Sequence, residues 1–216
     1  RFNLTNLKPG KLMKLYNSVG PNPHVVRMYA AECGLTLELE AIDLMAGANR
    51  QAPYLALNPS GQMPCLEMNN GEILAEITAI CEYLDEQADG VTLMGDSAET
   101  RATTRMWTRR VDLNICEPLT SGFRYSEGLP LFKERMTTIP EAADGLKQIA
   151  REKTAWLNNL ISDGRTFIGG DQISMADVVL YCFLTFAGSV GQPYDQELSH
   201  IHAWYERMAA RPSAAA

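Results

Sequence analysis

Residues 58–66 read Asn58-Pro59-Ser60-Gly61-Gln62-Met63-Pro64-Cys65-Leu66, so Met63-Pro64 stands between a glycine-containing turn and a short apolar strand. Proline at such a place removes a ladder donor and fixes φ, and chains keep it there mainly where a cis bond or tight bend turns the preceding backbone outward. We therefore predict a cis Met63-Pro64 bond that offers the backbone of Met63 to an extended ligand. Glu76 follows twelve residues after the proline, at the start of an amphipathic helix. The pattern predicts a site for a short peptide that carries an amine and a carboxylate.

On both sides of this stretch, segments with the apolar spacing of strands alternate with segments that have the apolar spacing of helices. Residues 12–16 read as a strand, and apolar residues recur at helical spacing over 25–33. Over 35–41 leucine and alanine alternate with threonine and glutamate, which predicts a strand with one buried face. A hairpin is expected around Asn69-Asn70-Gly71, followed by a closing helix whose apolar stripe spans 77–84. The order βαβ followed by ββα predicts a thioredoxin-like α/β domain with a right-handed crossover.

The rest of the chain has only helical patterns. We predict a linker over 88–97 and an all-α domain over 98–216, and we expect residues 1–12 to be a disordered tag or extension. Asp96 with Glu99 predicts a capping box at the first helix of this domain, and Ser174 with Asp177 predicts a second cap.

Composition narrows the class of protein. The 216 residues carry 19 Lys and Arg against 26 Asp and Glu, a net charge of −7, which argues against a nucleic-acid partner. Five scattered cysteines with no C-x-x-C argue against a disulfide framework, and a reducing cytosol is the expected location. No apolar run reaches the roughly 18 residues of a membrane span. The three histidines are not arranged as ligands, so no metal is expected.

From about Met13 to Ser213 the sequence resembles the cytosolic glutathione transferases, bacterial type. Three motifs in order carry the resemblance: NPSGQMPCL at 58–66, LAEITAICEYL at 74–84 and SMAD at 174–177. The resemblance implies a thioredoxin-like glutathione-binding domain over 13–87 and an all-helical domain over 98–216 that carries a hydrophobic substrate pocket. It also implies glutathione as cosubstrate, a small hydrophobic electrophile as second substrate, a detoxification role and a homodimer.

The resemblance places the glutathione contacts on residues of two loops and one helix start. Glu76 would pair with the γ-glutamyl ammonium, and the N–H groups of Ile77 and Thr78 at a helix N-terminus would bind the adjacent carboxylate. Arg50 would reach the glycyl carboxylate, while Gln62 and Met63-Pro64 would hold the remainder. Each of these two roles has an alternative. Glu76 could simply be a charge at the start of a helix, and Arg50 could be a solvated arginine in a loop. Family members usually have Ser or Thr where Ile77 stands, and Thr78 is expected to point elsewhere.

The residue that activates the thiol is left open among three candidates. The family's serine or cysteine position falls on Gly20, which has no side chain. Tyr16 and Ser18 lie shortly before it, and Asn22 precedes Pro23 in a pattern that predicts an N-cap with proline at N1. No cysteine lies in this loop, which disfavours a mixed-disulfide mechanism.

Two functions therefore remain. The first is a glutathione transferase that stabilises the glutathione thiolate and transfers it to the electrophile, which Met63-Pro64 and Glu76 favour. The second is a non-catalytic module of the same fold that binds a partner or an apolar ligand, which Gly20 and Ile77 favour.

Overall fold

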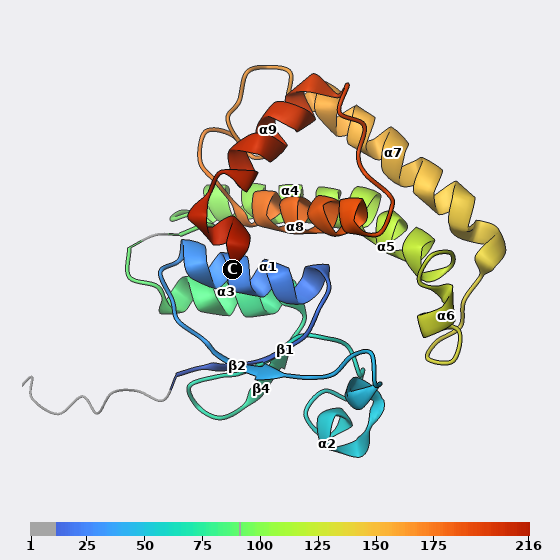
Figure 1. The fold of residues 1–216 in the computed structure, drawn as a ribbon. Coiled ribbons are helices and arrows are strands. Elements are labelled where there is room, and N and C mark those ends of the chain that lie inside the picture. The colour runs from blue at the N-terminus through green and yellow to red at the C-terminus, as the bar shows by residue number, and fades with distance from the viewer. Residues whose placement is uncertain (1–11, 91) are drawn as a thin grey trace, which may run out of the picture.

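The computed structural model describes residues 12–90 and 92–216, and it begins with a four-stranded sheet (Figure 1). The strands are β1 (Lys14–Asn17), β2 (Glu38–Ala41), β3 (Cys65–Glu67) and β4 (Ile73–Ala75), in the order β2-β1-β3-β4. β1 pairs with β2 in parallel, and β3 pairs with β1 and β4 antiparallel. The expected extension over 1–12 falls outside the described residues, apart from Leu12.

Two helices cover one face of this sheet. α1 (Pro21–Glu32) is the crossover between the parallel strands, and α3 (Ile77–Gln87) follows β4 beside it (Figure 1). Both bury an apolar stripe, since Val25, Tyr29, Ile80 and Leu84 are inaccessible to solvent. The short helices η1 (Ala48–Arg50) and α2 (Ala52–Leu55) lead from β2 back toward β3. The predicted βαβ-ββα thioredoxin-like domain is confirmed.

Residues 98–216 are helical and contain no strand. Their elements are α4 (Ala98–Val111), η2 (Asp112–Cys116), α5 (Glu117–Arg124), α6 (Leu129–Phe132), η3 (Pro140–Ala142), α7 (Ala143–Leu160), α8 (Met175–Ser189), α9 (Ser199–Ala209) and η4 (Pro212–Ala215). α8 lies at the centre of this part and packs against both α4 and α1 (Figure 1). Its residues are apolar almost all round, as expected for a core helix. One continuous hydrophobic core therefore runs from the sheet through α1 to α8.

The Ser174–Asp177 cap is confirmed, and its aspartate is fully buried. The Asp177 carboxylate accepts hydrogen bonds from the backbone of Ile168 and Ser174 and from Nε1 of Trp204, at 2.8, 2.9 and 2.8 Å. It thus joins the start of α8 to the preceding loop and to α9.

Three local predictions are wrong. The buried face expected over 35–41 is not present in β2, whose four residues are all exposed because it is an edge strand. The leucines of this stretch that pack on the core are Leu35 and Leu37, which precede β2. The capping box of α4 uses Ser97 and Thr100, one residue beyond the predicted pair. Asn22 is not an N-cap. The helix begins at Pro21, because either of two nearby prolines suits a first helical turn and the earlier one takes that place.

Candidate functional site

Two adjoining cavities lie between the sheet-containing part and the helical part. The first is about 350 Å³ and is bordered by the Met63-Pro64 corner, the start of α3, and η2 with α5. The second is about 550 Å³ and is bordered by the start of α1, the loop after β2, and α5 with α6. Five residues line both cavities: Asn22, Gln62, Met63, Thr120 and Arg124. A molecule in the first cavity therefore meets a molecule in the second at these residues.

The Met63-Pro64 corner is held in place by the turn before it. The Met63-Pro64 bond is cis, as predicted. The Tyr54 hydroxyl and the Asn58 amide both donate to the Gln62 carbonyl, at 2.6 and 2.9 Å. Asn49, which is 3% exposed, donates to the Gly61 carbonyl at 2.7 Å. These bonds satisfy the carbonyls before the corner and set the orientation of the Met63 backbone.

Glu76 stands on the first cavity at the N-cap of α3. Its φ is 69°, and among the described residues it is the sole non-glycine with a positive φ. Such a conformation costs about 1–3 kcal/mol and is typical of functional positions. Ile77 and Thr78 follow it on the same cavity, where the first N–H groups of a helix attract anions. Thr78 lines the cavity beside Ile77, and the direction expected for its side chain stays a prediction.

Arg50 lies on the second cavity and does not line the first. Its Nη1 donates weakly to the Ser60 carbonyl at 3.4 Å, and its buried Nε has no partner among the described residues. Asn49 lines the same cavity, and its buried Oδ1 is likewise without a partner there. Sequence reasoning missed Asn49, since a single asparagine in a loop carries no pattern.

Of the three candidate activating residues, only Asn22 lines the cavities. Tyr16 is 8% exposed, packs edge-on against Tyr54, and its hydroxyl donates to Glu67 at 3.4 Å. Burial, with the carboxylate of Glu67 beside it, raises the pKa of the Tyr16 hydroxyl. Ser18 donates its hydroxyl to the Ile42 carbonyl at 2.8 Å. The structure thus places Tyr16 and Ser18 away from both cavities.

The helical part adds charged residues that the sequence did not reveal. Asp112, Glu117 and Arg124 line the first cavity from η2 and α5. Burial raises the pKa of Asp112; Arg109 opposes this rise, and the carboxylates of Glu117 and Glu76 add to it. These residues are more than thirty positions from Glu76 in sequence, so only the tertiary fold brings them together.

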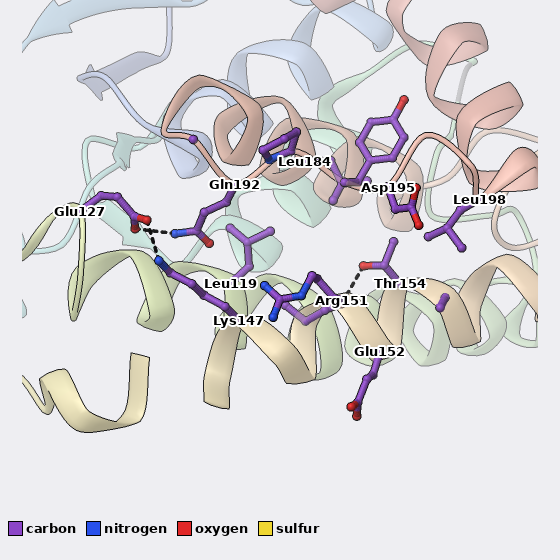
Figure 2. A pocket seen from close by; sticks show the side chains of 15 residues that line it. Leu119, Glu127, Lys147, Arg151, Glu152, Thr154, Leu184, Gln192, Asp195 and Leu198 are labelled. Carbon is purple, nitrogen blue, oxygen red and sulfur yellow. Dashed lines mark hydrogen bonds and ion pairs between the residues drawn. The ribbon is translucent and has the colours of Figure 1, made fainter. Parts of the chain in front are cut away.

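A third cavity, of about 600 Å³, lies in the helical part between α7 and the loop that follows α8 (Figure 2). Three of its polar groups pair with one another, because Glu127 accepts from Lys147 at 2.5 Å and from Gln192 at 2.8 Å. Although partial burial opposes it, these bonds lower the pKa of Glu127 to about 2. The groups that would recognise a charged peptide are on the two adjoining cavities instead.

Other kinds of site find little support in the described part of the chain. No group of three or more His, Cys, Asp or Glu there is arranged to hold a metal ion. The His24 ring contacts the Ala214 carbonyl at 3.2 Å, and the His202 ring contacts the Tyr194 hydroxyl at 2.9 Å. Among the described helices, none has the length and apolar character needed to cross a bilayer.

Comparisons with known proteins agree with this geometry. Residues 11–86 match the model of the glutathione S-transferase N-terminal domain, and residues 140–207 match that of the C-terminal domain. Glutathione S-transferase 2 of Saccharomyces cerevisiae is 30% identical over 208 residues, which cover 93% of this chain and 87% of that protein. Glutathione S-transferase GstA of Escherichia coli O157:H7 is 30% identical over 202 residues, covering 93% and 94%.

Among solved structures, a glutathione S-transferase domain-containing protein of Marinobacter aquaeolei VT8 has a TM-score of 0.87 and 33% identity. The match covers 93% of this chain and 99% of that one. Both domain models, the curated relatives and the shared fold lead to one conclusion: the chain belongs to the glutathione S-transferase family of enzymes.

Proposed function

We propose that the protein is a glutathione transferase that binds glutathione in the first cavity and transfers its thiolate to a small hydrophobic electrophile in the second. One observation carries the proposal: the first cavity unites the Met63-Pro64 corner, Glu76 and the N-terminus of α3, and it adjoins a second cavity at Met63. The two cavities give the two substrates separate places that meet at one point.

The first cavity offers partners for the charged groups of glutathione. The Glu76 carboxylate pairs with the γ-glutamyl ammonium, and the N–H groups of Ile77 and Thr78 hold the adjacent carboxylate. Gln62 and the Met63 backbone bind the cysteinyl part. The buried Nε of Arg50, without a partner among the described residues, supplies a donor for the glycyl carboxylate from the side of the second cavity.

The second cavity suits an apolar, aromatic electrophile. Phe123 stands edge-on to Phe132 and Phe186, with ring centroids 6.1 and 5.0 Å apart, and all three line the cavity. Leu131 and Met45 add aliphatic surface. Edge-to-face pairs of this kind leave ring faces available for a third ring.

Asn22 is the side chain that we assign to hydrogen bonding of the glutathione sulfur. It follows the proline that opens α1, it lines both cavities, and no side-chain bond at the helix cap occupies its amide. A donor here, together with the start of a helix, stabilises a thiolate.

The remaining proposals concern organisation. We infer a glutathione-binding domain over 13–87, a linker over 88–97 and a helical domain over 98–216. All five cysteines are free and buried, which suits a reducing cytosol, where the enzyme would act in detoxification.

We also propose a two-fold homodimer, the commonest closed assembly. Sedimentation equilibrium at micromolar concentration should give twice 23.9 kDa, and a monomer would contradict the assignment.

The experiment that tests the function is titration calorimetry with glutathione, followed by an activity screen over aryl halides, peroxides, isothiocyanates and β-aryl ethers. We expect saturable glutathione binding and turnover of at least one class. A protein without measurable glutathione binding would instead be the non-catalytic module, the reading favoured by Gly20, which has no side chain at the usual activating position.

A further inference from the structure

The place of the glutathione sulfur follows from the proposed function, on which this inference rests. If the Met63 backbone binds the cysteinyl part, the sulfur lies where the two cavities meet. The residues common to both cavities are therefore the ones that surround it. Two of them, Gln62 and Met63, belong to the peptide-binding corner.

The other three common residues differ in what they offer to a negative sulfur. The Thr120 hydroxyl is engaged, because it donates to the Cys116 carbonyl at 2.9 Å. Asn22 has a neutral amide. Arg124 is the only cation among the described residues that line both cavities. A neighbouring positive charge is the strongest of these influences on a thiolate.

Arg124 is well placed to act on a ligand at this junction. It ends α5, and its side chain is 23% exposed. A single ion pair at 3.6 Å joins its Nη1 to Glu117, whose own side chain is 58% exposed. A guanidinium has five N–H donors, so this one long contact leaves most of them for a ligand.

The other charged groups on the two cavities have their own partners or lie to one side. Arg135 donates to the carbonyls of Leu44 and Met45, at 2.7 and 3.0 Å, and Arg50 contacts the Ser60 carbonyl. Both line the second cavity alone. Glu127, also on that cavity, is bound by Lys147.

Three carboxylates face the first cavity: Glu76, Asp112 and Glu117. They disfavour a thiolate, and the γ-glutamyl ammonium offsets them only in part because it is a single charge. A cation at the sulfur would offset these carboxylates and add to the effect of Asn22, which favours the thiolate at neutral pH. We propose that Arg124, from the helical part, is the catalytic cation that stabilises the glutathione thiolate. In this step the S–H bond breaks, its proton passes to water, and the sulfur keeps the electron pair as a thiolate.

The test is a pH titration of the thiolate by its ultraviolet absorbance, in enzyme saturated with glutathione. An opposite charge within about 4–6 Å shifts a pKa by about 1–3 units, so Arg124→Gln should move the midpoint up by about one unit or more. The rate kcat at neutral pH should then fall by up to about tenfold for each unit, in proportion to the thiolate fraction. Arg124→Lys keeps the charge and should keep most of the shift. Glu117→Gln removes the opposing carboxylate and should move the midpoint down.

Opposite shifts from Arg124→Gln and Glu117→Gln are a result that loss of packing alone does not produce. Arg151→Gln is the matched control, because Arg151 of α7 lines the cavity of Figure 2 and neither of the other two; it should leave the titration unchanged. A wild-type midpoint in Arg124→Gln that still binds glutathione would overturn the assignment of Arg124. Absence of glutathione binding in the wild-type protein would overturn the proposed function itself. If Arg124→Gln does not fold, the midpoints of Arg124→Lys and Glu117→Gln decide whether Arg124 stabilises the thiolate.

Discussion

Glu76 is the residue at which stability and function conflict most clearly. Its φ of 69° is costly for any side chain with a Cβ, and glycine would relieve the strain. Glu76 and the two residues that follow it, Ile77 and Thr78, line the same cavity. The strain is explained if the carboxylate binds a cation that glycine could not bind.

Glu76→Gln keeps the size of the side chain and removes its charge. We expect glutathione affinity to fall by about 1.5–3 kcal/mol, or about one to two decades, because a charge-assisted bond is lost. The rate kcat should fall less, since binding common to ground and transition states appears mainly in KM. Calorimetry and steady-state kinetics measure the two effects. Unchanged affinity would mean that Glu76 is only a charge at a helix start.

Gly20 shows why the missing hydroxyl cannot simply be restored. Nothing lies within 4 Å of a Cβ built there, but its φ is 111°. Gly20→Ser should therefore cost about 1–3 kcal/mol of unfolding free energy through backbone strain, although space is ample. Gly145→Ser is the control, because a Cβ there also meets nothing and its φ is ordinary. Urea unfolding compares the two, and equal losses would contradict the argument.

At this scale, prediction succeeded where the signal is local. The cis bond at Met63-Pro64 follows from the sequence around it and is confirmed, whereas the role that the resemblance gives to Glu76 stays a prediction. Tyr16, Ser18 and Asn22 could not be ranked, because their directions depend on strand register and on which proline opens α1. Arg124 and Asp112 carried no signal at all, since they reach the cavities only through the packing of the helical part.

At the scale of elements, the predicted order of strands and helices held, while some boundaries shifted. The Asn69-Asn70-Gly71 hairpin and the Ser174–Asp177 cap are short-range patterns, and both are confirmed. The buried face expected for β2 is wrong, because position at the edge of a sheet is a property of the whole sheet. The π-helical η2, which carries Asp112 onto the first cavity, likewise left no recognisable pattern.

The loop after β2 is held by an arginine that is about ninety residues away. Arg135 donates to the carbonyls of Leu44 and Met45, on the loop that leads to Arg50. Arg135→Ala removes two bonds from a charged donor, each worth about 1.5–3 kcal/mol. We expect faster hydrogen exchange over residues 43–50 and a KM for glutathione raised about tenfold. Arg207→Ala, which removes a similar 2.7 Å bond to the Thr166 carbonyl, should change neither. Unaltered exchange over 43–50 in Arg135→Ala would show that the loop holds its own shape.

At the scale of the whole molecule, α1 joins the two parts of the chain. It covers the sheet on one side and packs against α8 and η4 on the other (Figure 1). Its last residue, Glu32, receives two hydrogen bonds from Arg211 at 2.6 and 2.7 Å and one from the Ser213 hydroxyl. The cavities lie between the same two parts, so this junction near the C-terminus helps to keep their walls together.

Protonation of Glu32 should weaken this junction in acid. Burial opposes ionisation, but the bonds from Arg211 and Ser213 outweigh it, and the pKa of Glu32 lies below its ordinary 4.5. Because the folded-state pKa is the lower one, this stabilisation is present above pH 4.5 and is lost as the pH falls through the folded-state value. Glu32→Gln should therefore lower the unfolding free energy at pH 7 by about 1.5–3 kcal/mol and flatten its dependence on acid pH.

Thermal and urea unfolding over a pH series measure both effects. The matched control is Glu82→Gln, which breaks an equally short pair with Arg105 at 3.0 and 2.7 Å. That pair is more exposed: the side chains of Glu82 and Arg105 are 34% and 57% accessible, against 10% and 30% for Glu32 and Arg211. Surface ion pairs contribute only about 0–1 kcal/mol to stability. Since the two variants remove the same charge, a larger loss in Glu32→Gln must come from burial at the junction of the two parts. Equal losses, or an unchanged acid slope in Glu32→Gln, would show that the packing of α1 on α8 holds the parts together without this ion pair.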